Sequence, residues 1–414
     1  MDGKRYLNKE EMYAFGDELF KIPELGYKEF ETKRRLTEYF ESNGLKIKEL
    51  GFETAFSVSI GKGKPHIGLI AELDAIPTLG HPYANKNDNY AAHSCGHSTQ
   101  CTIMSHALVA LNKQGIKKGT ITLFFTPAEE YTDVEYRKKL IKQKKINYIG
   151  GKVNMLMAHQ FDDVDMFIHL HTSNNNNYDM SINSSLGGFV YKQITFRGKA
   201  AHAAMCPEQG IDAMDMFEEF YKNMKQLRTA YPKEDMVRLH GIIDEGGQSV
   251  NSVPERIVYE MYARSINSET LLQLNKKVDK LAKDAAKKIG GKASIETSPG
   301  YLPLIQSDEL NKVVNKCVRK YTKKVLYDEK SIAAGDVGDM SQFKPLIQFG
   351  YMGFKGFCHS KELCVDDYEK AYLLPCKVVI DSCNALLNDP AAVKKIKQYK
   401  PHMTFKQYEE YVNA

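Results

Sequence analysis

The chain has 414 residues, of which 43% are hydrophobic and 26% are charged, and 57 Lys and Arg against 52 Asp and Glu leave a formal net charge of only +5. This composition is typical of a globular protein with a large core and two domains. It excludes a disordered chain and nucleic-acid binding through bulk positive charge. The first residues lack the apolar segment of a signal peptide, and no stretch approaches the roughly 20 apolar residues that a membrane span needs. We therefore expect a cytoplasmic protein whose partners include neither nucleic acid nor a membrane.

The eight cysteines are scattered without the regular spacing of a disulfide framework. Most are expected to be reduced thiols that pack as small hydrophobic side chains. Cys95 is the exception, because it lies two residues from His93 on one side and two residues from His97 on the other.

The first part of the chain alternates between helical and extended patterns. Apolar residues recur at helical spacing over residues 10–20 and 29–42, and Gly44 is placed to end the second helix. A third helix is predicted over residues 99–112. Short runs rich in β-forming residues predict strands at 55–60, 66–71 and 120–126. This alternation predicts an α/β domain with a mixed, largely parallel sheet that helices cover on both faces.

From about residue 187 the pattern changes to the order β-α-β-β-α-β, which is the signature of a split βαβ, or ferredoxin-like, unit. The predicted elements are, in chain order, 188–197, 211–227, 238–244, 257–265, 269–288 and 293–298. Because this unit is self-sufficient, we expect an inserted α+β domain at residues 187–297. The first domain would then comprise residues 1–186 and 298–414 and would end in a Lys-rich helical tail from Ala391.

The segment from Ala92 to Ser98 holds Cys95 and His97 directly before a predicted helix. A thiolate and an imidazole two positions apart can face one metal ion, and Gly96 between them permits the tight turn that this requires. The alternative is a buried structural cysteine flanked by surface histidines, which is the commoner state of an isolated pair of this kind.

Glu129 and Glu130 follow a strand that is apolar at every position except Thr122. Carboxylates at the C-terminal end of such a strand lie in the crevice where open α/β sheets bind ligands, so one can bind metal while the other transfers protons. Adjacent glutamates are usually a solvated surface pair. The apolar strand indicates burial on both faces and argues against that alternative.

Three further histidines are candidates. His169 and His171 are two positions apart after an apolar run, so both can point at one site, or one can be a structural histidine. His359 follows Gly356 in a loop, where a lone histidine is by itself more typical of a surface residue. Asp74 and His93 are placed to orient a ligating imidazole through a hydrogen bond.

Taken together and in this order, these segments resemble the M20 metallopeptidase family, and most closely its amidohydrolase branch. That branch includes aminobenzoyl-glutamate hydrolases, aminoacylases and auxin-conjugate hydrolases. The matching segments are Glu72–Pro77, His93–His97, Pro127–Glu130, Leu170–His171, Gly198–His202, Asn251–Pro254, Arg264 and His359. The resemblance extends from about Leu19 to Leu387. Relatives often have Asp where this chain has Glu72.

The resemblance implies a two-metal catalytic domain with an inserted lid domain that mediates homodimer formation. Its metal ligands, carried over to matching positions and holding Zn²⁺ or Mn²⁺, would be Cys95, His97, Glu130, His171 and His359. We favour His171 over His169 because of its position after the apolar strand. Glu129 would be the general base, and His202 would reach the partner subunit's active site and help to stabilise the oxyanion. Asn251, Arg264 and His202 would bind substrate.

The expected function is therefore metal-dependent hydrolysis of an amide bond in an N-acyl amino acid, an aryl-amide conjugate or a dipeptide. Two other classes stay open. A cysteine-nucleophile hydrolase would use Cys95 with His93 or His97, but it leaves Glu129, Glu130 and His359 without a role. A non-catalytic descendant would bind peptides or acyl-amino acids without turnover.

Overall fold

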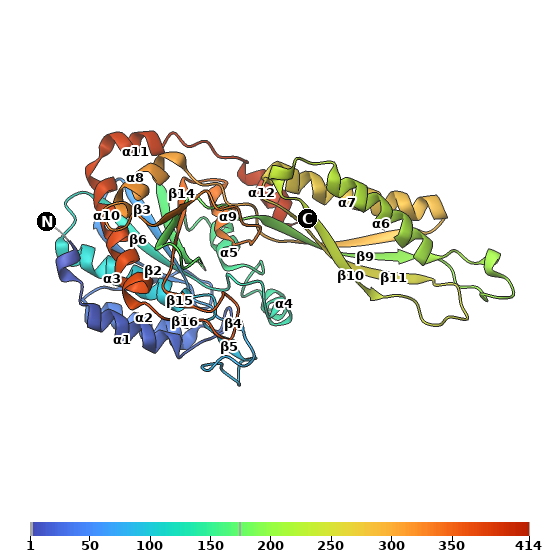
Figure 1. The fold of residues 1–414 in the computed structure, drawn as a ribbon, viewed down its shortest axis with the longest axis horizontal. Helices are drawn as coiled ribbons and strands as arrows, with labels where there is room; N and C mark the ends of the chain where they lie inside the picture. The colour runs from blue at the N-terminus through green and yellow to red at the C-terminus, as the bar shows by residue number, and fades with distance from the viewer. Residues whose placement is uncertain (1–2, 174, 414) are drawn as a thin grey trace. The chain divides into compact units, whose positions relative to one another are not determined.

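The computed structural model describes residues 3–173 and 175–413, and the chain divides into two compact units (Figure 1). Unit 1 takes the described residues of Met1–Ser184, Ile305–Lys330 and Asp339–Thr404. Unit 2 takes those of Ser185–Leu304, Ser331–Gly338 and Phe405–Ala414. The expected insert, residues 187–297, falls inside unit 2. Four segments that the sequence places in the first domain, 185–186, 298–304, 331–338 and 405–413, group with unit 2 instead.

Unit 1 is built on an eight-stranded sheet whose centre is parallel. Strands β6, β3, β7 and β14 run in the same direction, whereas β2 and β8 are antiparallel to their inner neighbours. This confirms the predicted α/β class with a mixed, largely parallel sheet. The strands are, from one edge to the other, β1 (Ile47–Glu49), β2 (Phe56–Lys62), β6 (Gly119–Thr126), β3 (His66–Glu72), β7 (Met166–Thr172), β14 (Leu346–Tyr351), β8 (Met180–Ile182) and β13 (Val325–Tyr327).

Helices cover this sheet, and alternation along the strands supplies an apolar surface to each face. Leu123 and Phe125 of β6 belong to the main core, while Phe124 contacts the rings of Phe161 and Phe167 on the other face. Helix α3 packs on β3 and is covered in turn by α1 and α10. The helices of unit 1 are α1 (Lys9–Phe20), α2 (Phe30–Ser42), α3 (His97–Gln114), α4 (Val134–Lys142), α5 (Gly151–Met157), α8 (Asp308–Val318), α10 (Leu374–Asn388) and α11 (Pro390–Ile396), and α9 (Val337–Ser341) begins in unit 2.

Unit 2 contains a four-stranded antiparallel sheet in the order β10-β11-β9-β12, with helices α6 and α7 packed against it and against each other. This confirms the predicted β-α-β-β-α-β order. The side chains of Asp212 and Asn267 cap the N-termini of the two helices. The elements are β9 (Gly188–Arg197), α6 (Ala213–Thr229), β10 (Arg238–Glu245), β11 (Arg256–Ser265), α7 (Ser268–Ile289), β12 (Lys292–Pro299) and α12 (Phe405–Val412).

The parallel strands of unit 1 bring Glu72 and several predicted site residues to one edge of the sheet. Glu72 is the last residue of β3, Glu129 and Glu130 follow β6, and His171 is the penultimate residue of β7. Two small ribbons supply the rest: β4 (Ile76–Pro77) with β5 (Ala91–Ala92), and β15 (Phe354–Lys355) with β16 (Cys364–Val365). The first leads to Cys95 and the second encloses the loop of His359.

The helices of the described residues include none with both the length and the apolar composition of a membrane span.

Candidate metal centre

The turn before α3 places Cys95 and His97 at the edge of the sheet. Gly96 between them adopts a left-handed conformation, with φ of 82°. A Cβ atom at Gly96 would lie 2.1 Å from Cγ2 of Thr172, so no larger residue fits without movement. Thr172 also donates a hydrogen bond from Oγ1 to the carbonyl oxygen of Cys95, at 2.9 Å. The turn is therefore fixed against the end of β7.

His97 is held with one ring nitrogen directed at carboxylates. Its Nδ1 lies 2.8 Å from the backbone carbonyl of Asp74, and because a carbonyl can only accept, Nδ1 carries the proton. Its Nε2 is buried and makes no hydrogen bond among the described residues, although Glu72 Oε2 and Glu129 Oε2 lie 3.3 and 3.9 Å away. Burial lowers the His97 pKa, but Glu72 and Asp74 together raise it well above its ordinary value. This is the arrangement of an imidazole that presents Nε2 to a cation while its N–H is anchored.

Cys95 lies between two other histidines. Its Sγ is 3.5 Å from His171 Nε2 and 3.4 Å from His359 Nε2. The backbone N–H of His359 donates to the carbonyl of Ser94, at 2.7 Å, which ties the two loops together. A hydrogen bond with Cys358, burial, and the carboxylate of Glu130 raise the Cys95 thiol pKa well above its ordinary value.

Glu130 and His359 form an ion pair, with 3.1 Å between Oε1 and Nε2. Burial raises the Glu130 pKa, but the hydrogen bond and positive charge of His359 outweigh it and hold the pKa at about 2. The backbone N–H of Glu130 donates to Asp74 Oδ2 at 2.9 Å, so Asp74 anchors both Glu130 and His97.

The loop that carries both glutamates depends on Glu29, which the sequence analysis did not identify. Its buried carboxyl accepts hydrogen bonds from the N–H of Ala128, at 3.0 Å, and from Oγ1 of Thr54, at 2.5 Å. Ala128 has a φ of 54°, a strained value for a residue other than glycine. Burial, with Asp74 nearby, raises the pKa of Glu29 to about 8. The result is a loop in which Glu129 and Glu130 are only 7% and 8% exposed.

His169 belongs to a separate buried network beside the cluster. Its Nε2 is 3.3 Å from Glu72 Oε1 and 2.9 Å from Gln100 Nε2, whereas His171 is the histidine that contacts Cys95. Lys152 Nζ lies 2.6 Å from the same Glu72 oxygen. Gln100 follows His97 by three positions, so helical spacing could have identified Gln100 from the sequence. Lys152 is a single lysine in the short helix α5, and the sequence gives no signal of its role.

Within unit 1, three overlapping groups of possible ligand atoms result, and within each group all atoms lie within 4.8 Å of one another. A thiol, imidazoles and carboxylates suit a transition-metal ion such as Zn²⁺, and the buried Nε2 of His97 fits the same role. His93, by contrast, is buried with neither ring nitrogen hydrogen-bonded among the described residues. The groups are Cys95, His97 and His171; Cys95, Glu130 and His359; and His97, Glu129 and Glu130.

The remaining predicted residues lie in unit 2, which brings two of them together. His202 forms a β-bridge with Ser252, and the N–H of Ala203 donates to the carbonyl of Asn251 at 3.0 Å. Arg264 lies eight positions after Arg256 along β11, roughly 26 Å farther along the strand. Its guanidinium lies over the rings of Phe189 and Tyr262, at 5.2 and 5.0 Å from their centroids. Because Val253 pairs with Ala201 and Ser252 with His202, just before Arg256 in the chain, Arg264 lies at the far end of β11 from the His202–Asn251 pair.

Comparisons with known proteins agree with this architecture. The model of peptidase family M20/M25/M40 matches residues 68–381. The N-acetyl-L-cysteine deacetylase of Bacillus subtilis is 25% identical over 353 residues, covering 82% of this chain and 79% of the relative. The Xaa-Arg dipeptidase of Mus musculus is 24% identical over 378 residues, covering 85% of this chain and 79% of the relative.

A solved structure shares the fold. A dinuclear metal-binding peptidase of the M20 family from Bacillus subtilis superposes with a TM-score of 0.70 at 17% identity, covering 94% of this chain and 99% of that chain. The predicted family resemblance is confirmed. The chain belongs to peptidase family M20/M25/M40 and is a hydrolase of amide bonds.

Proposed function

We propose that this hydrolase cleaves N-acyl amino acids, aryl-amide conjugates or dipeptides with two divalent cations held by Cys95, His97, Glu130, His171 and His359. One observation carries the proposal: two ligand groups, one with His97 and His171 and one with Glu130 and His359, share the sulfur of Cys95. A shared ligand is what places two ions side by side. The names of the relatives, an N-acetyl-L-cysteine deacetylase and an Xaa-Arg dipeptidase, support the substrate class.

The donor set favours Zn²⁺ or Mn²⁺. A thiolate favours zinc, whereas imidazole and carboxylate ligands also suit manganese. When bound, such ions supply a Lewis acid for the amide carbonyl and lower the pKa of the attacking water.

Glu129 would take the proton of the attacking water and deliver it to the leaving amine. The two adjacent glutamates contact different histidines. Glu130 Oε1 is 3.1 Å from His359 Nε2, whereas Glu129 Oε2 is 3.9 Å from His97 Nε2. Both are shielded from bulk solvent, which strengthens electrostatic interactions with a reacting group. This division assigns metal binding to Glu130 and proton transfer to Glu129.

The charges around Cys95 argue against a cysteine nucleophile. A nucleophilic cysteine needs a lowered pKa, but Cys358, burial, and the carboxylates of Glu130 and Glu129 raise the pKa of Cys95. A cation among the carboxylates would reverse this effect and favour the thiolate. Activity that survives complete removal of metal by a chelator would revive the alternative.

The substrate-binding and dimer assignments rest on unit 2. Because Arg264 and the His202–Asn251 pair are far apart along one chain, we propose that they serve one active site only when contributed by two chains of a homodimer. Strand β10 supports this: it lies at the edge of its sheet and exposes Ile242 (66%) and Ile243 (44%), so a second copy could pair with it. A guanidinium at position 264 suits the carboxylate of an amino-acid product. A cytoplasmic location stays the prediction made from composition.

The decisive experiment separates proton transfer from metal binding. Glu129→Gln should abolish turnover of a panel of N-acyl amino acids and dipeptides while elemental analysis still finds two ions per chain. Cys95→Ser should lose bound metal as well as activity. Cys364→Ser, at an exposed thiol, is the matched control and should behave as the native protein. Loss of metal from Glu129→Gln would show that Glu129 binds metal and that Glu130 transfers the proton. Full metal retention by Cys95→Ser would refute the proposal that Cys95 is a ligand shared by the two ions.

A further inference from the structure

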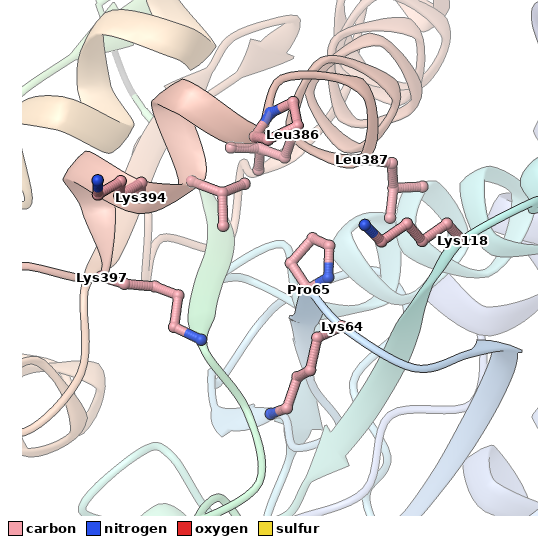
Figure 2. Close-up of a pocket in the computed structure, with 9 residues that line it drawn as sticks. Lys64, Pro65, Lys118, Leu386, Leu387, Lys394 and Lys397 are labelled. Atoms are coloured by element: carbon pink, nitrogen blue, oxygen red, sulfur yellow. The ribbon is translucent and has the colours of Figure 1, made fainter.

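A cavity lies in unit 1, away from the candidate metal centre, and is shown in Figure 2. Its volume is about 410 Å³, a size suited to a small molecule. It is lined by Lys64, Pro65, Lys118, Leu386, Leu387, Pro390, Val393, Lys394 and Lys397. The lining thus joins the segments before β3 and β6 to the end of α10 and to α11, which lies in the Lys-rich tail.

The cavity and the candidate metal centre lie at opposite ends of the same strands. Pro65 directly precedes β3 and Lys118 directly precedes β6. The candidate ligands and Glu72 lie at the other ends of these strands. Along β3, from His66 to Glu72, this separation is roughly 20 Å. A ligand of the cavity therefore does not touch the residues proposed for hydrolysis.

The cationic side chains of the cavity are of two kinds. Lys64 and Lys397 both contact Oδ1 of Asp165, at 3.3 and 3.1 Å, so one carboxylate is shared by two ammonium groups. Lys118 and Lys394 have no ion pair or side-chain hydrogen bond among the described residues, and both are exposed. Four lysines against one aspartate leave the cavity with an excess of positive charge, which favours an anionic ligand.

The other side chains form an apolar wall. Leu386 is fully buried and Val393 is 9% exposed, so both are fixed by the core rather than by the cavity. Leu387, Pro65 and Pro390 complete the apolar part of the lining, as the labelled side chains of Figure 2 show for Leu387 and Pro65. A purely inorganic anion would leave Leu387, Pro65 and Pro390 in contact with water. A ligand with an apolar body would cover it.

We propose that this cavity binds a small organic anion that combines a single carboxylate or phosphate head with an apolar body. The head pairs with Lys118 or Lys394, and the body packs against Leu387, the prolines and Val393. The site is independent of the proposed hydrolytic function, because it shares no residue with the metal centre.

Calorimetry with the full-length protein tests the proposal. Octanoate and octyl phosphate should bind, whereas acetate (head only), octanol (body only) and octylammonium (reversed charge) should bind at least about tenfold more weakly, since each lacks one of the two complementary features. Equal binding of octanoate and acetate would overturn the role of the apolar wall. Binding to phosphatidylglycerol vesicles without binding of monomeric octanoate would overturn the small-molecule site.

Two double variants locate the site. Lys118→Gln with Lys394→Gln should weaken octanoate binding about tenfold or more. Lys117→Gln with Lys395→Gln removes the same charge at the adjacent exposed positions, which do not line the cavity, and should leave binding unchanged. Equal losses in the two variants would show a non-specific effect of net charge and would refute the site. Unchanged melting temperatures and unchanged hydrolysis by both variants should show that the fold and the metal centre are intact.

Discussion

Lys152 Nζ lies 2.6 Å from Oε1 of Glu72, and both side chains are almost completely shielded from solvent. Burial by itself raises the Glu72 pKa, but Lys152, followed by His169 and His97, brings it well below its ordinary value. The pair therefore fixes a negative charge directly beside His97.

Lys152→Met should destabilise the fold by about 3–5 kcal/mol, because it leaves a buried carboxylate without its cation. Urea unfolding measures the loss. Adding Glu72→Gln to Lys152→Met should recover much of it, since the uncompensated charge is then gone. Lys138→Met is the control, because Lys138 and its partner Glu135 are exposed, and it should have no measurable effect. A Lys152→Met protein as stable as the native one would contradict this account.

Gly96→Ala should destabilise the protein and disturb the Cys95 turn. The new Cβ meets Thr172 Cγ2 at 2.1 Å, and a left-handed φ of 82° is unfavourable for alanine. The two costs together amount to roughly 2–4 kcal/mol. Gly44→Ala offers a matched control, because Gly44 has a φ of 72° but nothing within 4 Å of the added Cβ. Thermal melts should show a clearly larger loss for Gly96→Ala, and equal losses would remove the steric argument.

Glu29 should position the loop of Glu129 without taking part in proton transfer. In Glu29→Gln the amide oxygen can still accept from Ala128 and the amide nitrogen can donate to Thr54, so kcat and metal content should stay near the native values. Glu29→Ala leaves two buried donors unpaired, each at a cost of roughly 1–3 kcal/mol, and kcat should fall with the geometry of the loop. An alanine variant with native kcat would show that Ala128 holds its conformation unaided.

The ion pair of Glu130 and His359 should make the metal-free protein most stable in mildly acidic solution. The Glu130 pKa falls from 4.5 to about 2 on folding, so its contribution is complete above pH 4.5 and is lost as the pH drops towards 2. Interaction with the Glu130 carboxylate, which accepts from the protonated imidazole, raises the His359 pKa, so that contribution is complete below pH 6.5 and is lost as the pH rises through the raised value.

His359→Asn should therefore lower the melting temperature of chelator-treated protein most between pH 4.5 and 6.5, and little at pH 2. His159→Asn is the comparison, because His159 makes a similar contact with Asp162 but is well exposed. A His359→Asn effect that is constant with pH would indicate packing rather than charge.

Mixed dimers test whether His202 acts across chains. Inactive His202→Ala subunits mixed with inactive Glu129→Gln subunits should regain some activity, because one of the two sites in a mixed dimer then has both groups. The recovered rate should depend on the mixing ratio and peak near equal amounts. No recovery in dimers shown to be mixed would refute the sharing of His202.

The sequence by itself determined the architecture and the chemistry of the chain. Strands and helices with strong periodicity, such as β9 (Gly188–Arg197) and α7 (Ser268–Ile289), lie where the pattern predicts them, because their spacing reflects which face is buried. The motifs around Cys95, Glu129 and His171 indicated the family, since their residue types and order depend on the reaction rather than on packing details. After Gly300 the pattern predicted only a return to the first domain, and β14 (Leu346–Tyr351) was not identified.

Only the tertiary structure decided which partners these residues have. His169 and His171 share a strand face, so periodicity left both as candidate metal ligands. The fold places Glu72 and Gln100 beside His169, and Cys95 beside His171. Lys152, Glu29 and Cys358 carry no motif, and they matter because distant segments bring them against the site. Local sequence fixes the direction in which a side chain points. Which charge or donor it meets depends on contacts between residues far apart in the chain, and those exist only once the sheet has formed.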